Sequence, residues 1–532
     1  MGPTAGLASD VVVIGAGPVG QTAALLCSQW GLRVRVLEAQ THRDRTGSRA
    51  ICQQREVLDT WDAIGAGVLI DRGITWSRAR TYYRDKEIFS VELKDRGSAL
   101  LPPFVNIAQS EVEETLLGLI ERSPLVDVEY GAKVTRLQSE NDKALLEVDT
   151  PAGARRIESR FVIACCGLHS EELRAQIGVD FPGQSFDDLF LICDIKADLR
   201  EQRGERRFHF DPNWNPGRQV LIHEQPDSIW RVDWQVPEDF DLAREEATGG
   251  LHRRIREIAG CQPYELVWRS VYRFQGRVAS RFRHGSIFLA GDFAHVFAPF
   301  GARGLNSGVH DVENLVWKLA MVARGLADSR LLDSYEVERR AAALENLEVT
   351  SATMRFLVPQ TEADRRRRTL LLEGAAHGSR AAISAVDSGR LYEPYWYVDS
   401  PLTTPAPGRT FGGRPSRGEP VDPVPGTVLP DLPLFASSGE RRRPQRLRQL
   451  VHHTFTVLSD EPSFVQALEH LPVEVMDLNR LDPKRSLRRA LDLGDRPVHL
   501  VVRPDGHLAA MIEGNPSGVP VALQRALGNA SA

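Results

Sequence analysis

Hydrophobic residues near the start of the chain form a short continuous run that is typical of a buried strand. Residues 10–14 read DVVVI and lead into Gly15-Ala16-Gly17-Pro18-Val19-Gly20, after which apolar residues continue over 21–26 with the spacing of a helix. A second run over 31–37 ends at Glu38. This order predicts a βαβ unit at the N-terminus.

Alternation of apolar and polar residues marks the middle of the chain. Strands are predicted over 126–130, 134–137, 144–148 and 160–164, and from about 190 to 272 the period becomes two. In 230–236, Trp230, Val232, Trp234 and Val236 share one face, whereas Arg231, Asp233 and Gln235 share the other. This is the pattern of a half-buried antiparallel strand, and it predicts a sheet-rich region over 181–274.

Further patterns predict helices and one more junction of strand, loop and helix. A helix is predicted over 57–64, and another begins near Ser110, with Ser110 as its N-cap and Glu113 in the capping-box position. Residues 285–290 form an apolar strand, followed by a glycine-rich loop over 291–308 and a helix over 309–320.

The last part of the chain divides into two segments. Residues 396–435 are dense in proline and glycine and are predicted to be a connector without regular structure. Residues 436–532 show strands at 454–458, 473–476 and 498–502, a helix from Phe464 to Leu468, and a hairpin turn at 503–506. The sequence therefore predicts a small α/β unit at the C-terminal end.

Composition limits the class of protein. The chain has 532 residues, 42% hydrophobic and 26% charged, which is enough for two or three globular domains. A net charge of -5 argues against nucleic-acid binding and favours small-molecule partners. Six cysteines without CxxC spacing, the lack of a leader pattern and the lack of a long apolar run predict a cytoplasmic protein with no membrane span. No metal site is predicted.

The glycine motif indicates the chemistry of the N-terminal unit. In a Gly-x-Gly-x-x-Gly turn, Gly15 permits the sharp turn, Gly17 lets the backbone approach a pyrophosphate, and Gly20 packs helix against strand. The helix that follows offers unpaired N–H groups and the positive end of its dipole. Glu38 stands at the distance expected of the acid that accepts hydrogen bonds from a ribose. The alternative is a glycine-rich turn of an ordinary βαβ unit, and the motif alone leaves NAD and FAD open.

A second motif favours FAD over NAD as the dinucleotide. Gly291-Asp292-x-x-His295 is followed by Pro299-x-Gly301-x-x-Gly304-x-Asn306. Together with the first motif, this resembles the para-hydroxybenzoate hydroxylase family of single-component FAD-dependent aromatic hydroxylases. The resemblance is closest to the longer members that act on 3-(3-hydroxyphenyl)propionate-type substrates.

The resemblance implies an α/β fold with three parts. A Rossmann-like FAD-binding domain would take residues 1–180 and 275–395, and an inserted sheet domain for substrate would take 181–274. Behind the connector, residues 436–532 would form a thioredoxin-like domain, which has no cysteine and so cannot perform disulfide chemistry. Its role would be structural or oligomeric, and a homodimer is compatible with the family. Because residues after about Phe435 contain no cysteine and no recognisable cofactor motif, their removal is expected to leave flavin binding and ring chemistry qualitatively intact.

The resemblance also implies site residues. Gln109 and the backbone of Val134 would hold the adenosine half of FAD together with Glu38. Arg49 would contact the flavin or cap its loop, and its residue type alone favours the cap. Asp292 would lie at the ribityl or pyrophosphate region. The carbonyl of Pro299 would lie near flavin and substrate, which makes it the candidate positioning group. The full predicted cofactor set is Gly15, Gly17, Pro18, Val19, Gly20, Glu38, Arg49, Gln109, Val134, Asp292, Gly304, Leu305 and Asn306.

The implied reaction is hydroxylation of a phenolic or polyketide-type aromatic substrate with O2, through a flavin C4a-hydroperoxide. The reductant would be NADPH or NADH, which lacks a domain of its own because no second glycine motif has a strand and helix around it. Baeyer-Villiger oxygenation or epoxidation on the same scaffold stays open, as does a flavin- or drug-binding protein without turnover. No acid-base residue is assigned from the sequence.

One position departs from the family pattern. Where members usually carry Cys-Asp-Gly-x-x-Ser, this chain has Cys165-Cys166-Gly167-Leu168-His169-Ser170. Cys166 therefore replaces a carboxylate, although Gly167 and Ser170 of the turn are kept. His169 likewise replaces a common arginine. Because the family associates this motif with both FAD and NADPH, the expected consequences are weaker attachment of the flavin and altered handling of the reductant.

Overall fold

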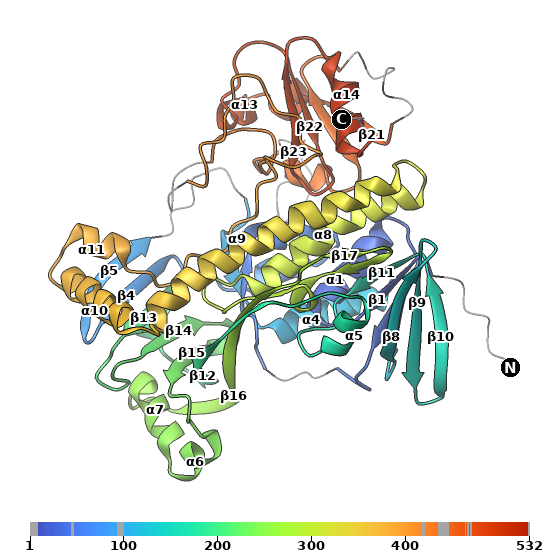
Figure 1. The fold of residues 1–532 in the computed structure, drawn as a ribbon. Coiled ribbons are helices and arrows are strands. Elements are labelled where there is room, and N and C mark those ends of the chain that lie inside the picture. The colour runs from blue at the N-terminus through green and yellow to red at the C-terminus, as the bar shows by residue number, and fades with distance from the viewer. Residues whose placement is uncertain are drawn as a thin grey trace.

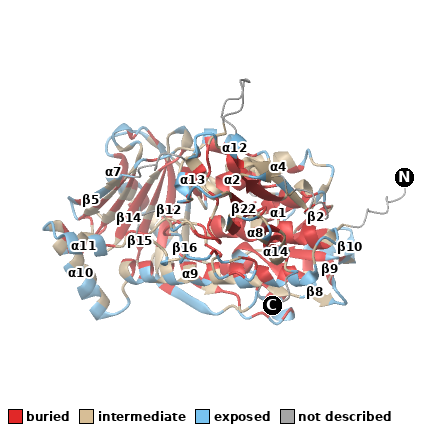
Figure 2. Ribbon diagram, turned by 90° about the horizontal axis from the view of Figure 1, so that it is seen from above, coloured by how far each residue is buried: buried red, intermediate tan, exposed pale blue. Residues whose placement is uncertain are grey.

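The computed structural model describes residues 9–43, 47–92, 100–415, 421–434, 446–462, 464, 468 and 471–529. In Figure 1 the long helix α9 (Asp333–Leu357) crosses the molecule, and the C-terminal residues form a lobe above α8 (Gly304–Ala323) and α9. Buried positions gather along α1 (Pro18–Gln29), α8 and the strands of the eight-stranded sheet described below, which we call the large sheet (Figure 2). Within the described ranges, no helix combines the length and the apolar character needed to cross a bilayer.

A six-stranded sheet forms the centre of the N-terminal part. Its order is β17-β18-β11-β1-β2-β7, and all neighbours are parallel except the edge pair of β17 with β18. The residues of β1 are all buried, as expected for a central parallel strand that is covered on both faces. The predicted βαβ unit of β1, α1 and β2 is confirmed. The strands are β1 (Val11–Ile14), β2 (Val34–Glu38), β7 (Val126–Tyr130), β11 (Phe161–Ala164), β17 (Arg283–His284) and β18 (Ile287–Leu289).

An antiparallel meander packs against this sheet and shares its core. It consists of β8 (Lys133–Glu140), β9 (Lys143–Thr150) and β10 (Gly153–Ser159), in the order β10-β9-β8. Other short elements surround the sheet: β3 (Cys52–Gln54), α2 (Arg55–Ala63), α3 (Val68–Arg72), β6 (Phe104–Asn106), α4 (Gln109–Ile120) and α5 (Glu171–Gln176). The helix predicted over 57–64 is thus confirmed as α2.

The predicted cap of α4 is wrong. The helix begins at Gln109 with Ala108 as N-cap, so Ser110 lies inside the first turn and no side chain caps the helix. The carboxylate of Glu113 instead accepts a hydrogen bond from Gln109 Nε2 at 2.8 Å. A capping box requires the serine to precede the first helical residue, and here the helix starts earlier.

An eight-stranded sheet forms the second layer, in the order β19-β16-β12-β15-β14-β13-β4-β5. Its strands are β4 (Arg78–Tyr83), β5 (Lys86–Glu92), β12 (Gly183–Ala197), β13 (Glu205–Phe210), β14 (Gln219–Glu224), β15 (Ile229–Val236), β16 (Tyr264–Val278) and β19 (His295–Val296). The sequence placed β4 and β5 in the range of the first domain, but β4 pairs in parallel with β13 of this sheet. Apolar alternation identifies a strand and does not identify its partner, so this long-range pairing escaped the pattern.

The expectation that β15 is half-buried is also wrong. Trp230, Val232 and Trp234 are buried against α7 (Gly250–Ala259), which follows α6 (Leu242–Ala247). On the opposite face, Arg231 and Gln235 are buried as well. Polar residues therefore face the interior of the protein here, which is the arrangement of a sheet that covers a polar cavity.

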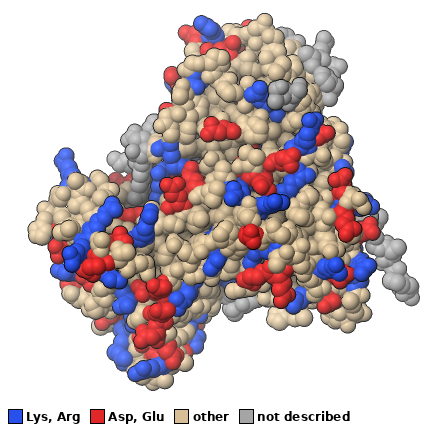
Figure 3. Space-filling view, viewed as in Figure 1, with Lys and Arg blue, Asp and Glu red and all other residues tan. Residues whose placement is uncertain are grey.

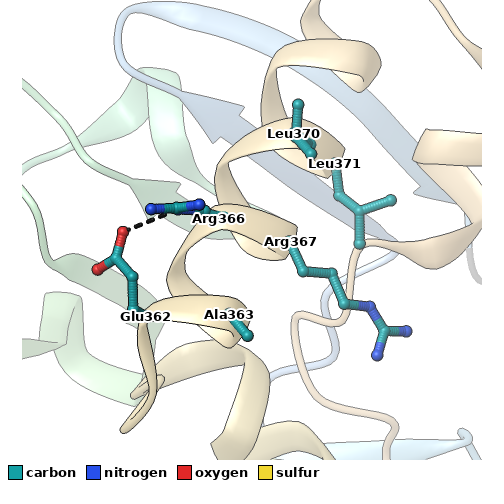
Figure 4. Close-up of a pocket in the computed structure, with 6 residues that line it drawn as sticks. All are labelled: Glu362, Ala363, Arg366, Arg367, Leu370 and Leu371. Atoms are coloured by element: carbon teal, nitrogen blue, oxygen red, sulfur yellow. Dashed lines mark hydrogen bonds and ion pairs between the residues drawn. The ribbon is translucent and has the colours of Figure 1, made fainter.

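Helix α10 (Glu362–Ala376), with α11 (Arg380–Ala385), covers the end of the large sheet. Figure 4 shows a surface hollow along α10 in which Arg366 pairs with Glu362 at 3.0 Å and Leu370 is 70% exposed. In the basic run from Arg365 to Arg368, the first three residues are exposed, as a solvated helix face requires, whereas Arg368 is partly buried and lies over the ring of Phe210. Figure 3 shows basic and acidic side chains interspersed over the visible face.

The C-terminal lobe contains a four-stranded mixed sheet in the order β21-β20-β22-β23. β20 is parallel to β21 and antiparallel to β22, and β22 is antiparallel to β23. The elements are β20 (Phe455–Ser459), β21 (Val473–Asp477), α12 (Leu478–Leu481), α13 (Ser486–Ala490), β22 (Val498–Val502), β23 (Leu508–Glu513) and α14 (Gly518–Ala526). The predicted hairpin turn at 503–506 is confirmed. The predicted helix from Phe464 to Leu468 falls mostly outside the described residues.

The segment that leads to this lobe lies against it. Among the described residues of 396–434, none belongs to a helix or a multi-residue strand. Backbone N–H groups of Thr404 and Gly426 nevertheless donate to carbonyls of Ala509 and Leu508 on β23, at 2.8 Å and 2.7 Å. Leu429 and Leu432 join the core of the lobe. The segment is thus irregular and yet packed.

Two buried clusters of charge fasten the lobe to the rest of the molecule. In the first, the Glu338 cluster, Glu338 of α9 binds Lys318 of α8 at 2.6 Å and Arg503 of the hairpin turn, and Arg503 also binds Asp505. All four side chains are at most 1% exposed. The second, the Asp59 cluster, joins α2 to the segment before β20 through Asp59, Asp62, Asp431, Arg446, Arg448 and His452.

Candidate active site

The two large sheets enclose a cavity of about 480 Å³. It lies at the carboxyl ends of β1, β11 and β18, the edge at which open α/β sheets bind ligands. The residues that follow those strands line one side, and the polar face of the large sheet lines the other. Among the residues predicted as site residues, those that line the cavity are Gly17, Pro18, Val19, Gly20, Arg49, Gln109, Asp292, Pro299, Gly304, Leu305 and Asn306.

The three glycines of the first motif have different surroundings. A Cβ on Gly20 would lie 2.0 Å from the carbonyl oxygen of Gly15, so the turn and α1 touch here. Gly15 has a φ of +100°, and its Cβ would lie 2.6 Å from the carbonyl oxygen of Cys165. A Cβ on Gly17 would meet nothing within 4 Å. The first and third glycines therefore serve packing, whereas the second leaves open space in front of the helix.

That open space faces the first turn of α1. Pro18 occupies the first turn, where it has no N–H to leave unsatisfied. The N–H groups of Val19 and Gly20 have no carbonyl partner within the helix, because the first turn of a helix offers none. A negatively charged group in the cavity would meet these N–H groups and the positive end of the helix dipole.

Glu38 ends β2 beside this turn. Its carboxylate accepts hydrogen bonds from Ala16 N at 2.8 Å and from Gln40 N at 2.9 Å. Glu38 does not line the cavity, and neither do Gly15 and Val134, which is buried in β8. Glu38 thus fixes the glycine turn from behind, and its predicted contact with a ribose stays a prediction, as does the role of Val134.

The loop before β3 forms one wall of the cavity. Gln109 Oε1 accepts a hydrogen bond from Ala50 N at 3.3 Å, so Gln109 joins this loop to α4. Gly47 has a φ of +91°, and a Cβ there would lie 2.7 Å from the ring of Trp268. Both contacts hold the backbone of Arg49 at the cavity.

Behind the loop of the second motif lies a buried ion cluster. Asp311 of α8 accepts hydrogen bonds from Gly291 N at 3.0 Å, His295 Nε2 at 2.7 Å and Arg339 Nε at 2.8 Å. Burial alone would raise the pKa of Asp311, but His295 and Arg339 outweigh it and lower the pKa. The anion of Asp311 therefore fixes the turn at Gly291, whose φ is +59°.

Asp292 and Pro299 themselves face the cavity. The side chain of Asp292 is exposed toward the cavity. Desolvation by the surrounding protein raises the pKa of its carboxyl group, and the charges of His295 and Arg49 oppose this effect. The carbonyl of Pro299 accepts a hydrogen bond from Ala302 N at 3.0 Å, which fixes its direction.

The N-terminus of α8 closes the same side. A Cβ on Gly304 would meet nothing within 4 Å, so this end of the helix is open to the cavity. The side chain of Asn306 is occupied by β3: it donates to the carbonyl of Cys52 and accepts from Gln54 N, each at 2.9 Å. Asn306 thus attaches α8 to β3.

An aromatic group from the large sheet covers the other side. Phe190 and Phe274 stack with ring centroids 4.3 Å apart, and Phe300 meets both rings edge-on at 5.5 Å and 5.9 Å. Such a wall excludes water and suits a flat apolar ligand. The apolar runs of the sequence did not show that these three phenylalanines share one cavity.

A row of polar residues on the large sheet was also missed by the sequence analysis. Arg206 of β13, His223 of β14 and Arg231 of β15 line the cavity on neighbouring strands. The only signal was the alternation in β15, which placed Arg231 on the polar face without showing that the face is buried.

The turn after β11 keeps its backbone despite the cysteine at 166. Gly167 has a φ of +78° and lines the cavity, and Ser170 Oγ donates to the carbonyl of Cys166 at 3.0 Å. Burial raises the pKa of the Cys166 thiol to about 11, against the opposing effects of Ser170 and Arg174. The thiol is therefore uncharged at neutral pH.

We expect Cys166→Asp to bind FAD more tightly than the parent protein. Ser170 and Arg174, which lie close enough to affect the thiol, would stabilise a carboxylate there. The gain of a charge-assisted contact corresponds to about 1.5–3 kcal/mol, or about a ten- to hundredfold lower Kd. Flavin fluorescence titration at one ionic strength measures it. Weaker binding by a folded variant would show that the site has been repacked around the thiol.

Comparison with known proteins points to one family. The FAD binding domain family matches residues 8–350. The chain is 28% identical over 373 residues to a 3-(3-hydroxy-phenyl)propionate/3-hydroxycinnamic acid hydroxylase of Mycolicibacterium smegmatis, covering 69% of this chain and 65% of that protein. The chain is 30% identical over 395 residues to the protein of the same name from Mycolicibacterium gilvum, and this match covers 72% of this chain and 65% of that protein. The chain thus spans just under two thirds of the length of these relatives.

Solved structures share the fold. The flavin-dependent monooxygenase PieE, solved in complex with FAD and substrate, superposes with a TM-score of 0.83 at 19% identity, covering 98% of this chain and all of that chain. Aklavinone-11 hydroxylase, in a ternary complex with FAD and aklavinone, superposes with a TM-score of 0.76 at 20% identity, and the match covers 99% of this chain and all of that chain. These likenesses establish a mixed α/β fold shared with flavoprotein hydroxylases. Within the described residues, no group of three or more His, Cys, Asp or Glu side chains is arranged to hold a metal ion.

Proposed function

The chain belongs to the FAD binding domain family, and on this premise we propose that it is an FAD-dependent monooxygenase of the aromatic hydroxylase type. The family membership confirms the resemblance inferred from the two glycine motifs. The reductant we propose is NADPH or NADH, and the substrate is a phenol or a polyketide-type aromatic compound. The names of the relatives and the aromatic wall of the cavity support this class of substrate.

One observation carries the proposal. A single cavity joins the open N-terminus of α1, which suits a pyrophosphate, to a wall of stacked phenylalanines, which suits a flat ring. A protein that only stored a dinucleotide would not require the second wall. The coexistence of both in one space favours a flavin and an aromatic substrate held side by side.

The residues present fit FAD. Gly17 and Gly304 leave space at two helix N-termini, where the pyrophosphate and the polar edge of the flavin ring would lie. Glu38 stands beside the glycine turn for the ribose, and Gln109 keeps the wall formed by Arg49 in place. When bound and reduced, the flavin supplies activation of O2.

The chain itself positions the reactants and excludes water. Asp311 anchors the turn at Gly291, so Asp292 and the segment to Pro299 keep one position against the cavity. Phe190, Phe274 and Phe300 remove water from the space where the ring would bind. The carbonyl of Pro299 would orient the ring toward the flavin.

The domain division predicted from the sequence remains part of the proposal. We assign 1–180 with 275–395 to FAD, 181–274 together with β4 and β5 to the substrate sheet, 396–435 to the connector and 436–532 to a thioredoxin-like lobe. The strand order β21-β20-β22-β23, with one parallel and two antiparallel pairs, supports the last assignment.

The test is a turnover assay with the purified protein. We expect yellow protein with one non-covalent FAD, and NAD(P)H oxidation that phenols stimulate with addition of one oxygen atom to the ring. NMR of the product separates ring hydroxylation from an ester formed by Baeyer-Villiger oxygenation. Colourless protein that fails to take up FAD would contradict the proposal, as would FAD-loaded protein that no phenol stimulates.

We expect Glu38→Ala to weaken FAD binding by about 1–3 kcal/mol, because the ribose and Ala16 N both lose their charged acceptor. Isothermal titration with FAD measures the change. Glu114 is a matched control, since it is exposed and pairs with Arg43 on the surface, and Glu114→Ala should leave the Kd unaltered. If Glu38→Ala also leaves the Kd unaltered, Glu38 only shapes the turn.

A further inference from the structure

The row of polar residues on the large sheet has a definite geometry. His223 is the direct cross-strand partner of Arg231 on β15. On the other side of β14 lies β13, where Arg207 pairs with Ile222. Arg206 precedes Arg207 in this antiparallel pair and therefore lies opposite His223. The two arginines are buried, at 4% and 5% exposure, and all three residues line the cavity. An imidazole thus stands between two guanidinium groups on one face of the sheet.

His223 differs from its neighbours in its bonding. Arg231 donates to Asp233 at 2.8 Å and to the carbonyl of Arg49, and Arg206 donates to the carbonyl of Ser388 at 2.7 Å. Among the described residues, the Nδ1 atom of His223 is buried without a hydrogen-bond partner. Because Nδ1 is buried, it does not open onto the cavity. The Nε2 atom of the same ring is not among the buried atoms and has no hydrogen-bond partner in the described part of the chain, so it is the nitrogen that a ligand in the cavity can reach.

The charges around His223 keep its ring neutral. Burial first, and then Arg206 and Arg231, hold the pKa of His223 well below its usual range. Two carboxylates also belong to this face of the sheet, Asp233 on β15 and Asp194 on β12, and both lie close enough to Arg231 to raise its pKa. The arginines therefore outweigh the acids at the imidazole, and His223 keeps an acceptor nitrogen at neutral and mildly acidic pH.

We propose that His223 accepts the hydrogen bond of a ring hydroxyl of the substrate and thereby selects hydroxylated over unhydroxylated aromatic compounds. Arg206 and Arg231 are donors only, and the carboxylate of Asp233 is engaged by Arg231. A phenolic hydroxyl donates one hydrogen bond and accepts others, which matches an acceptor between two donors. The inference rests on the proposed function, because it assumes that the aromatic substrate binds in this cavity.

Binding of paired probes to FAD-loaded protein without reductant tests the inference. The pairs are 3-(3-hydroxyphenyl)propionate with 3-phenylpropionate, and 2-naphthol with naphthalene. The change in flavin absorbance measures the binding of each compound. The wild-type protein should bind the hydroxylated member about tenfold more tightly. His223→Phe should lose this preference, and His223→Gln, which retains an acceptor oxygen, should keep part of it. Flavin content and circular dichroism check that the variants are folded.

The pH dependence of the wild-type preference is a test that needs no variant. Because the ring stays neutral, the preference should be constant between about pH 5.5 and 7.5, where an ordinary histidine titrates. Equal binding of both members of each pair, including no binding of either, would overturn the inference. So would a preference that persists in His223→Phe, or one that disappears on acidification with a midpoint near the ordinary pKa. Stimulation of NAD(P)H oxidation is measured separately, so failure of the proposed function is distinguishable from failure of this role.

Discussion

Glu338→Ala should lower the free energy of unfolding by about 3–5 kcal/mol, because it removes the anion from a fully buried cluster. Glu338 Oε1 accepts from Arg503 Nη1 at 2.5 Å, and Oε2 accepts from Lys318 Nζ at 2.6 Å and Asn314 Nδ2 at 2.7 Å. Without it, Lys318 and Arg503 are left with one buried carboxylate, Asp505, which of these two cations pairs only with Arg503. Urea unfolding followed by circular dichroism measures the change in the midpoint at constant slope.

The control for this substitution lies on the same helix. Glu348 is exposed on α9, and Glu348→Ala should alter stability by no more than about 0.5 kcal/mol. Glu338→Gln keeps the shape and an acceptor oxygen, so it should fall between the two. Equal stability of Glu338→Ala and the parent would show that Arg503 and Lys318 find other partners or water.

The same cluster makes stability depend on pH. Burial alone would raise the pKa of Glu338, but Arg503 and Lys318 outweigh it and hold the pKa well below its usual range. A carboxylate with a depressed folded-state pKa stabilises the protein above its unfolded pKa, and this contribution is lost as the pH falls below about 4.3 toward the folded-state value. The parent should therefore lose stability below about pH 4, and Glu338→Ala should show a smaller loss over the same range.

The cluster also changes the interpretation of the C-terminal lobe. From the sequence, its lack of cysteine and of a cofactor motif suggested that it could be removed without effect on flavin binding. In the structure, the hairpin turn at 503–506 places Asp505 against α8: Trp317 of α8 donates to Asp505 and packs edge-on against Phe455 of β20. Removal of the lobe would expose α8, the helix whose N-terminus faces the cavity. The lobe is thus part of the support for the candidate active site.

Sequence reasoning succeeded where the signal is local. The Gly15 to Gly20 turn, the loop from Gly291 to Asn306 and the helices that follow them are contiguous. Gly15 and Gly291 have a positive φ, and Gly20 touches the turn, so these three have a backbone reason to be glycine. It failed where the contact is distant: Glu338 meets Arg503 across 165 residues, and β4 meets β13 in parallel. The row of Arg206, His223 and Arg231 escaped for the same reason, because cross-strand register is set by pairing and not by spacing along the chain.

Gly17→Ala should weaken FAD binding by about ten- to hundredfold, and it should leave the stability of the FAD-free protein unchanged. The backbone at Gly17 is extended, with a φ of -70°, so alanine adopts it without strain, and its Cβ would meet nothing within 4 Å. The methyl group would instead occupy the space where a pyrophosphate approaches the N–H groups of α1, with the loss of charge-assisted hydrogen bonds of about 1.5–3 kcal/mol.

Gly20→Ala is the contrasting variant, and the pair together tests the placement of the cofactor. The added Cβ at Gly20 would lie 2.0 Å from the carbonyl oxygen of Gly15, so α1 must move away from the turn. This variant should lose stability and FAD binding together, whereas Gly17→Ala should lose only binding. Thermal unfolding without FAD and fluorescence titration with FAD separate the two effects. Unimpaired FAD binding by a folded Gly17→Ala protein would mean that the dinucleotide does not approach the N-terminus of α1, and the proposed arrangement of the active site would have to be abandoned.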